Sequence, residues 1–234
     1  TGTSVYFSAI KISPFSNSNS TTLFVGTQSG RLYRVDNANS NPNTIEIGSS
    51  QFPTANISSI DIGTSEDELF ITFSNYGVSS VWMSQDGGVN WIEKESNLPD
   101  MPVRWGLIHP DNSNFALIAT EIGVWETANL LDDNTIWQPS SSGLANVRVD
   151  MLSIRENDNM VVAASHGRGL FYGIFESEVS LNGDLNTDGN VNILDVVILV
   201  NSILDNEFNL FADLNQDGFN NVLDIVQLVN IILD

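Results

Sequence analysis

The fold of the C-terminal part of the chain is decided by a repeated segment: DLNTDGNVNILD (residues 184–195) recurs twenty-nine residues later as DLNQDGFNNVLD (residues 213–224). In both copies, oxygen-bearing side chains stand at positions one, three, five and nine, glycine at position six and aspartate at position twelve. Each copy runs directly into an apolar stretch that is expected to be helical. Unrelated Asn/Asp-rich turns would not keep glycine and the carboxylates in the same register twice.

This spacing is that of the twelve-residue calcium loop of EF-hands, in which glycine allows a sharp turn at position six. Position seven contributes a main-chain carbonyl oxygen, and position nine often acts through water. Two features depart from a standard EF-hand. Position twelve is aspartate in place of glutamate, and the segment before the first loop is too short and polar to form a helix. The sequence therefore predicts two Ca²⁺ ions held by loops that have only an exiting helix.

A duplicated loop with only its exiting helix resembles a dockerin, a small secreted module that folds on calcium and binds a cohesin domain. The resemblance covers roughly residues 181–234. It implies that the first ion is bound by Asp184, Asn186, Asp188, the carbonyl of Asn190, Asn192 and Asp195. It implies that the second is bound by Asp213, Asn215, Asp217, the carbonyl of Phe219, Asn221 and Asp224.

The resemblance also indicates where a partner binds, at loop positions ten and eleven and about one and a half turns further along each helix. These positions hold Ile193, Leu194, Val200 and Asn201 in the first copy, and Val222, Leu223, Val229 and Asn230 in the second. Cellulosomal dockerins carry Ser or Thr in the first pair and basic residues in the second, and this chain has neither. We therefore expect an apolar contact surface, as in type II dockerins.

Composition narrows the class of protein. The formal net charge of −21 and the absence of Lys and Arg after Arg168 disfavour nucleic acid and anionic membranes as partners. Cysteine is absent, which excludes disulfides and thiol chemistry. Polar residues interrupt the apolar stretch after Asp195, so no transmembrane segment is expected. Together with the calcium loops, this favours a secreted or surface-displayed bacterial protein. The chain starts at Thr1 without a leader, so we expect a processed chain or a piece of a longer one.

Residues 1–175 form a repeat array. Each repeat has a short β-rich strand, a second strand that ends in a small residue, and then glycine followed by an aromatic residue. The small residues recur at intervals of about 45 and are Thr27, Ser74, Thr120 and Ser165. This period with several short strands per unit predicts β-propeller blades. The expected organisation is a mostly β protein, with a propeller over 1–175, a linker over 176–181 and a helical calcium-binding module over 182–234.

One repeat carries the motif Ser-x-Asp-x-Gly-x-x-Trp as Ser84, Asp86, Gly88 and Trp91. Its expected role is structural: the Asp side chain caps backbone amides, glycine takes a positive φ, and the tryptophan fills the space between strands. A degenerate copy is predicted at Leu130, Asp132, Asn134 and Trp137. The array thus resembles the Asp-box (BNR-repeat) propellers, which include sialidases, xyloglucanases and sortilin-like proteins.

The fourth repeat ends after the strand at Leu170–Phe175, so the array is expected to be the C-terminal part of a longer propeller. The alternative is a ring of four blades that residues 1–8 close. No catalytic residue can be named, because Asp61, Asp111 and Asp150 mark no pair. We expect a calcium-dependent attachment protein, whose partner is a cohesin-like domain, another extracellular protein or its own propeller, with polysaccharide a further candidate ligand. The alternative is part of an extracellular glycoside hydrolase.

Overall fold

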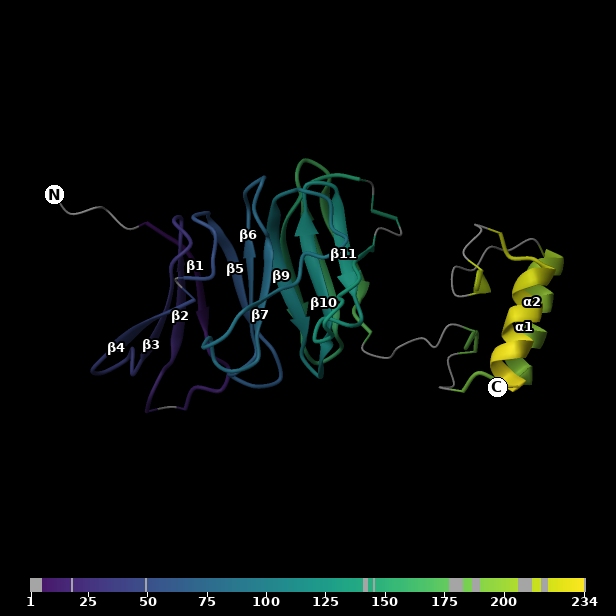
Figure 1. Ribbon diagram of the computed structural model, residues 1–234, viewed down its shortest axis with the longest axis horizontal. Coiled ribbons are helices and arrows are strands. Elements are labelled where there is room, and N and C mark those ends of the chain that lie inside the picture. The colour runs from purple at the N-terminus through teal and green to yellow at the C-terminus, as the bar shows by residue number, and fades with distance from the viewer. Residues whose placement is uncertain are drawn as a thin grey trace. The chain divides into compact units, whose positions relative to one another are not determined.

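The computed structural model describes residues 6–17, 19–48, 50–140, 143–144, 146–176, 183–186, 190–205, 212–215 and 219–233. The chain divides into two compact units, Thr1–Ser177 and Glu178–Asp234 (Figure 1). The first unit is built of antiparallel strands and the second of two helices, as the sequence predicts. Apart from Glu176, the predicted linker lies outside the described residues.

The first unit consists of four antiparallel sheets that follow one another along the chain. In each sheet neighbouring strands in the sequence are hydrogen-bonded neighbours, which is the meander of a propeller blade. The first sheet contains β1 (Phe7–Ile12), β2 (Leu23–Thr27), β3 (Leu32–Asp36) and β4 (Asn43–Ile47). The second contains β5 (Ile57–Ile62), β6 (Leu69–Phe73), β7 (Val81–Ser84) and β8 (Ile92–Glu93). The third contains β9 (Val103–His109), β10 (Asn112–Thr120), β11 (Gly123–Thr127) and β12 (Gln138–Pro139). The fourth contains β13 (Val149–Arg155), β14 (Met160–Ser165) and β15 (Gly169–Ile174).

The four sheets share one strand register. In each, a bulge lies near the start of the first strand, and the residue opposite it on the second strand is Thr27, Phe73, Thr120 or Ser165. The sequence-based choice of Ser74 was therefore one residue late. The expected aromatic residues occupy one position of the third strand, and they are Tyr33, Trp82, Trp125 and Phe171.

Neighbouring sheets bury their apolar faces against each other. Phe24 and Leu32 of the first sheet share a core with Ile60 and Ile71 of the second. The contact is close because Gly26 has no side chain: a Cβ atom there would lie 2.6 Å from Cγ2 of Ile57. A blade of this kind cannot bury its two faces alone, so the sheets stabilise one another in series.

The first strand does not close the last sheet. β1 pairs with β2 inside the first sheet, and the amide of Gln28 donates a 3.0 Å hydrogen bond to the carbonyl of Tyr6. In the described residues, the fourth sheet has three strands and ends at β15. Residues 6–8 are thus part of the first sheet, which counts against the four-bladed ring, and residues 1–5 lie outside the described residues.

The second unit packs α1 (Ile193–Asp205) against α2 (Val222–Leu233). Its core is centred on Leu199 and Leu228, both fully buried, together with Ala212. Leu199 and Leu228 are twenty-nine residues apart, so the two sequence copies supply equivalent halves of one core. None of the helices that the structure describes is long and apolar enough to cross a membrane.

Candidate calcium and partner-binding site

The carboxylate of Asp195 joins the start of the first loop to the start of α1. Its Oδ1 accepts hydrogen bonds from the backbone amides of Leu185 (2.8 Å) and Asn186 (3.1 Å). Its Oδ2 accepts one from the amide of Asn192 (2.8 Å), while the side-chain oxygen of Asn192 caps the amide of Leu194 at 2.9 Å. These contacts form an N-terminal cap: the side chain of Asn192 accepts from an amide of the first helical turn, and the side chain of Asp195, the third helical residue, accepts from the amide of Asn192.

The second loop repeats the arrangement. Oδ1 of Asp224 accepts from the amides of Leu214 (2.9 Å) and Asn215 (3.3 Å), and Oδ2 accepts from the amide of Asn221 (2.8 Å). The side-chain oxygen of Asn221 caps the amide of Leu223 at 2.8 Å. Aspartate suits position twelve because its short side chain lies close enough to the loop backbone for both oxygens to reach amides.

The charges of these loops fit a pair of cations. Asp184, Asp195, Asp213 and Asp224 are all buried. Backbone amides satisfy part of the hydrogen-bonding capacity of Asp195 and Asp224, but no Lys, Arg or His follows Arg168 anywhere in the sequence. Buried carboxylates are costly unless a positive charge compensates them. Oxygen donors around buried negative charge are the environment that Ca²⁺ prefers, and the donors present fit it.

The predicted ligands fall into two groups. In each loop, hydrogen bonds tie the position-twelve carboxylate to the backbone amides of the third and ninth positions, and the position-one aspartate is buried. Position seven is occupied by Asn190 in the first loop and by Phe219 in the second. In each copy the position-nine side-chain amide donates to the position-seven carbonyl, at 3.1 Å in the first and 3.3 Å in the second. The position-five ligands Asp188 and Asp217 lie outside the described residues. Within the described part, no cluster of three or more His, Cys, Asp or Glu side chains occurs. Each predicted site has three aspartates, at positions one, five and twelve, and the one at position five lies outside the described residues.

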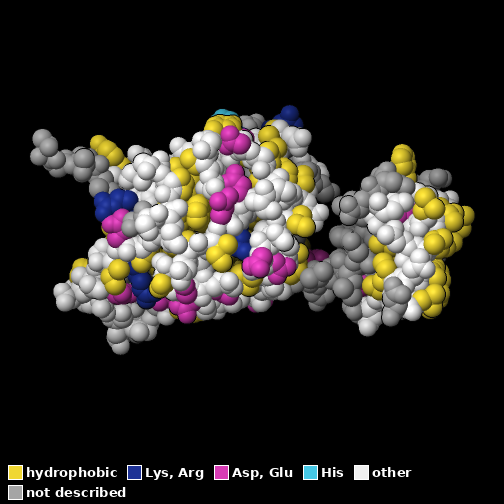
Figure 2. Space-filling view, viewed as in Figure 1, with side chains coloured by type: hydrophobic (Ala, Val, Ile, Leu, Met, Phe, Trp, Pro, Cys, Tyr) yellow, Lys and Arg dark blue, Asp and Glu magenta, His cyan; other side chains and the backbone are white. Residues whose placement is uncertain are grey.

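The predicted partner surface is exposed on both helices. Ile193, Leu194 and Asn201 are exposed on α1, as are the equivalent Val222, Leu223 and Asn230 on α2, whereas Val200 and Val229 are half-buried. The structure adds Val197 and Val226, each 53% exposed, and Leu204 and Leu233 at the far ends of the helices. Their exposure was not predicted from the sequence, although Val197 lies four residues after Ile193 and three after Leu194, and Val226 lies equally far from Val222 and Leu223, which places each set on one helix face. Figure 2 shows apolar side chains gathered on the helical unit.

In the first unit, Ser84 and Asp86 organise the turn between β7 and β8. The Ser84 hydroxyl donates to Asp86 Oδ1 at 2.9 Å and accepts from the amide of Gly88 at 2.9 Å. Oδ1 of Asp86 also accepts from the amide of Asn90 at 2.8 Å, and this bond is the main cause that lowers the pKa of Asp86. Gly88 has a φ of 91°, and Trp91 is buried with its Nε1 donating to the Gly88 carbonyl. These contacts hold a structural turn.

The degenerate copy of this turn was placed incorrectly from the sequence. Thr127 ends β11 as Ser84 ends β7, and its hydroxyl donates to Asn129 Oδ1 at 2.8 Å. That oxygen accepts from the amide of Ile136 at 2.9 Å, as Asp86 accepts from Asn90. The counterparts of Ser84 and Asp86 are therefore Thr127 and Asn129, three residues before Leu130 and Asp132. Trp137 is buried as predicted, and its Nε1 donates to the carbonyl of Lys94.

Two of the three acidic residues considered for catalysis, Asp61 and Asp150, have structural partners. Asp61 is buried, forms an ion pair with Lys11 at 2.6 Å and accepts from the amide of Ile108 at 2.8 Å. Burial raises the pKa of Asp61. Asp150 forms an ion pair with Arg148 at 2.6 Å. Asp61 therefore links the first three sheets, because Lys11 lies on β1 and Ile108 on β9.

The family model of the dockerin type I domain matches residues 182–233, which are therefore a dockerin type I domain. Dockerin type I domains bind calcium, in agreement with the buried carboxylates of both loops. The match is to the type I model, although the apolar residues at the recognition positions resemble those of type II dockerins. A comparison with curated protein sequences finds no match.

Solved structures similar to the chain include a β-propeller domain. An ancestral GH74 enzyme has a TM-score of 0.54 at 15% identity, covering 78% of this chain and 30% of that chain. The β-propeller domain of Cps50 (Swd1) from Myceliophteria thermophila has a TM-score of 0.51 at 14% identity, covering 70% of this chain and 50% of that chain. The chain thus spans half or less of the structures it matches, and the likeness establishes the fold of the first unit, a set of propeller blades.

Proposed function

We propose that this protein is an extracellular attachment protein whose dockerin domain binds a cohesin-like domain in the presence of calcium. The supporting observation is the exposed apolar stripe that recurs on α1 and α2 directly after two loops with buried carboxylates. Two Ca²⁺ ions, one per loop, would order each loop and fix the start of each helix. The propeller unit is the cargo or scaffold that this attachment positions.

The duplication predicts two equivalent binding faces. Ile193 and Leu194 on α1 match Val222 and Leu223 on α2, and both pairs follow a capped loop. Either helix can therefore present the same apolar edge to a partner. A charge placed on one helix leaves the other face intact, whereas charges on both remove both faces.

The test is binding of the full chain to a panel of type I and type II cohesin domains, measured by surface plasmon resonance in calcium and in chelator. We expect binding in calcium that chelator abolishes. Leu194→Asp and Leu223→Asp alone should each retain binding, and the double variant should lose it. Ile122→Asp changes an exposed apolar residue of the first unit and is the matched control. Failure of every cohesin to bind a calcium-loaded, helical chain would refute the proposal.

Docking of the dockerin domain on its own propeller makes a different prediction. In that case Ile193→Asp would lower the melting temperature of the first unit as well as change binding. An unchanged melting temperature of the first unit would exclude this alternative.

A second candidate is a role in polysaccharide hydrolysis, for which the likeness to an ancestral GH74 enzyme is the supporting observation. The ion pairs of Asp61 and Asp150 do not favour a catalytic role for these two residues. Incubation of the chain with a panel of β-glucans and measurement of released reducing ends tests this candidate. If the chain releases reducing ends and the Asp61→Asn and Asp150→Asn variants release them equally well, the catalytic carboxylates are other residues.

A further inference from the structure

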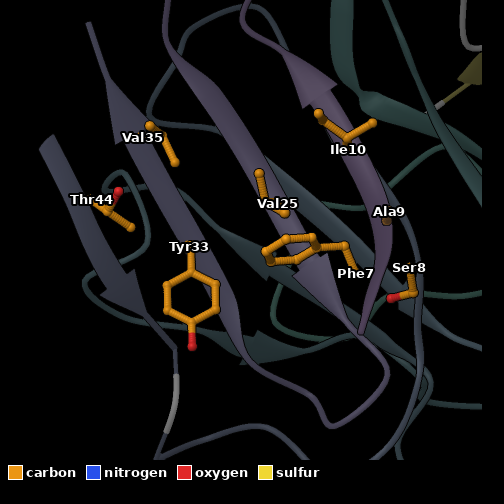
Figure 3. A pocket seen from close by; sticks show the side chains of 8 residues that line it. All are labelled: Phe7, Ser8, Ala9, Ile10, Val25, Tyr33, Val35 and Thr44. Atoms are coloured by element: carbon orange, nitrogen blue, oxygen red, sulfur yellow. The ribbon is translucent and has the colours of Figure 1, made fainter. Parts of the chain in front are cut away.

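An apolar cavity of about 630 Å³ lies on the first sheet, over β1, β2 and β3 (Figure 3). Phe7, Val25 and Tyr33 are among its lining residues, none of which is charged. It therefore offers a ligand mainly apolar contact. Charged side chains that can recognise a polar ligand gather elsewhere, at the junction where the third sheet packs against the fourth.

Charged side chains from both sheets meet at this junction. We call them the junction cluster and define it by Arg104, Glu121, Arg148, Asp150 and His166. Oδ1 of Asp150 accepts from Nε of Arg148 at 2.6 Å and lies 3.9 Å from Nε of Arg104. Oδ2 of Asp150 lies 3.3 Å from Nδ1 of His166. Arg104 donates to Glu121 through both Nε and Nη2, so the two carboxylates hold the two arginines in place.

Strand bulges position the centre of the junction cluster. The residue that the bulge adds to the first strand of each sheet is, in order, Ser8, Ser58, Arg104 and Asp150. A bulge redirects a side chain, and bulges are over-represented next to active sites. In the third and fourth sheets the redirected side chains carry opposite charges and meet across the junction. The cluster therefore depends on a backbone feature that all four sheets share.

Arg148 keeps hydrogen-bond donors that most arginines of the chain use internally. Arg31, Arg34, Arg104 and Arg155 each direct both Nε and Nη2 at carboxylates. Within the described part of the chain Arg148 uses only Nε, so both of its terminal nitrogens keep their N–H groups. Its side chain is 37% exposed, so a ligand can reach these donors. In a chain with 29 Asp and Glu against 8 Lys and Arg, spare guanidinium donors are unusual.

We propose that the junction cluster binds a sugar acid of an acidic polysaccharide, with the ligand carboxylate on the terminal nitrogens of Arg148 and its hydroxyls on Asp150. The planar edge of a guanidinium matches a carboxylate and binds it with two parallel hydrogen bonds. Asp150 has acceptor capacity left after its contacts with Arg148 and His166, and hydroxyls are donors that can use it. A ligand that carries both a carboxylate and neighbouring hydroxyls matches this mixture of donors and acceptors better than a neutral sugar does.

Asp150 keeps its negative charge in the cluster. Burial acts to raise the pKa of Asp150, but the hydrogen bonds from Arg148 and His166 outweigh burial and hold that pKa below its usual value. The ion pair therefore persists at neutral pH and keeps the Arg148 guanidinium in one orientation. The net charge of −21 repels an anionic polymer at long range, so binding depends on these local contacts. Physiological ionic strength screens the repulsion beyond about 8 Å.

The experiment is isothermal titration calorimetry of the full chain at physiological ionic strength with three oligosaccharides of equal length and linkage. They are a glucuronate oligosaccharide, its neutral glucose counterpart, and a sulfated form of the neutral chain. We expect the glucuronate oligosaccharide to bind and the neutral one, which lacks only the carboxylates, not to bind. Equal binding of the neutral chain would overturn the proposal. Binding of the sulfated chain as tight as that of glucuronate would also overturn it, because recognition would then rest on anionic charge alone.

Variants of two arginines make the test specific to the junction cluster. Arg148→Gln removes the guanidinium donors and should raise the dissociation constant for the glucuronate oligosaccharide by at least about tenfold. Arg148→Lys keeps the charge without the planar edge and should give an intermediate loss. Arg155→Gln changes an arginine at the other end of β13 that already pairs with Asp158, and it is the matched control.

The control also sets the outcome that would contradict the site. Unchanged binding in Arg148→Gln, or an equal loss in Arg155→Gln, would show that the ligand binds elsewhere. An unchanged melting temperature by tryptophan fluorescence confirms that each variant is folded.

Discussion

Asp195 and Asp224 combine two tasks, since each ties its loop to a helix and each is a predicted ligand. Asp195→Asn separates the two roles. Asparagine keeps an oxygen that accepts from the amides of Leu185 and Asn186, but it loses the negative charge. We expect calcium affinity at the first loop to fall by at least about tenfold, since ligand charge sets the affinity of such loops. Calorimetry should then count one tight ion in place of the two proposed here. Asp158→Asn, an exposed acid of the first unit, should leave both ions bound, and two tight ions in Asp195→Asn would contradict the assignment.

Asp86 provides a pH-dependent test in the first unit. The amide of Asn90 chiefly holds the pKa of Asp86 below its usual value. A carboxyl whose pKa is lowered by folding stabilises the protein above its unfolded pKa of about 3.9, and this stabilisation is lost as pH falls through the folded pKa. We expect Asp86→Ala to melt below the wild type at neutral pH, and the difference in melting temperature should shrink below about pH 4. A difference that is constant with pH would show that charge contributes nothing to the turn.

At the scale of the elements, the two helices are equivalent halves of one core. Leu199 and Leu228 are both fully buried, so Leu199→Ala and Leu228→Ala should each destabilise the helical unit by about 2–5 kcal/mol. Val197→Ala changes an exposed residue of α1 and should cost far less. Chemical denaturation followed by helical circular dichroism in calcium measures all three. A large difference between the two leucine variants would show that the halves are not energetically equivalent.

The elements also show which features could be predicted from the sequence and why others could not. Both loops and the aromatic position of each third strand were found because repeats fix their spacing, as with Trp82 and Trp125. The second turn of the kind that Asp86 organises was placed three residues late because Asn129 and Trp137 are eight residues apart, whereas Asp86 and Trp91 are five apart. An insertion inside a turn leaves its hydrogen bonds unchanged but shifts any ungapped motif. The exposure of Val197 and Val226 was not predicted, because an apolar residue in an amphipathic helix is first expected to face the core.

At the scale of the whole molecule, the two units have separate spectroscopic reporters. All five tryptophans, Trp82, Trp91, Trp105, Trp125 and Trp137, lie in the first unit. Both helices of the described chain lie in the second. A change in tryptophan fluorescence therefore reports on the propeller sheets, and a change in helical circular dichroism reports on the dockerin domain.

Calcium removal should separate these two signals. The buried carboxylates of the loops have no cationic side chain after Arg168 to compensate them, so chelator should leave them repelling one another and unfold the helices. The propeller sheets are held by apolar faces and by ion pairs such as that of Lys11 with Asp61, which chelator does not touch. We therefore expect chelator to abolish most of the helical signal while the midpoint of the thermal transition seen by tryptophan fluorescence stays unchanged. Helicity that survives in chelator would show that apolar packing around Leu199 and Leu228 folds the domain without metal. A fall in the fluorescence midpoint would show that the folded dockerin domain also stabilises the propeller.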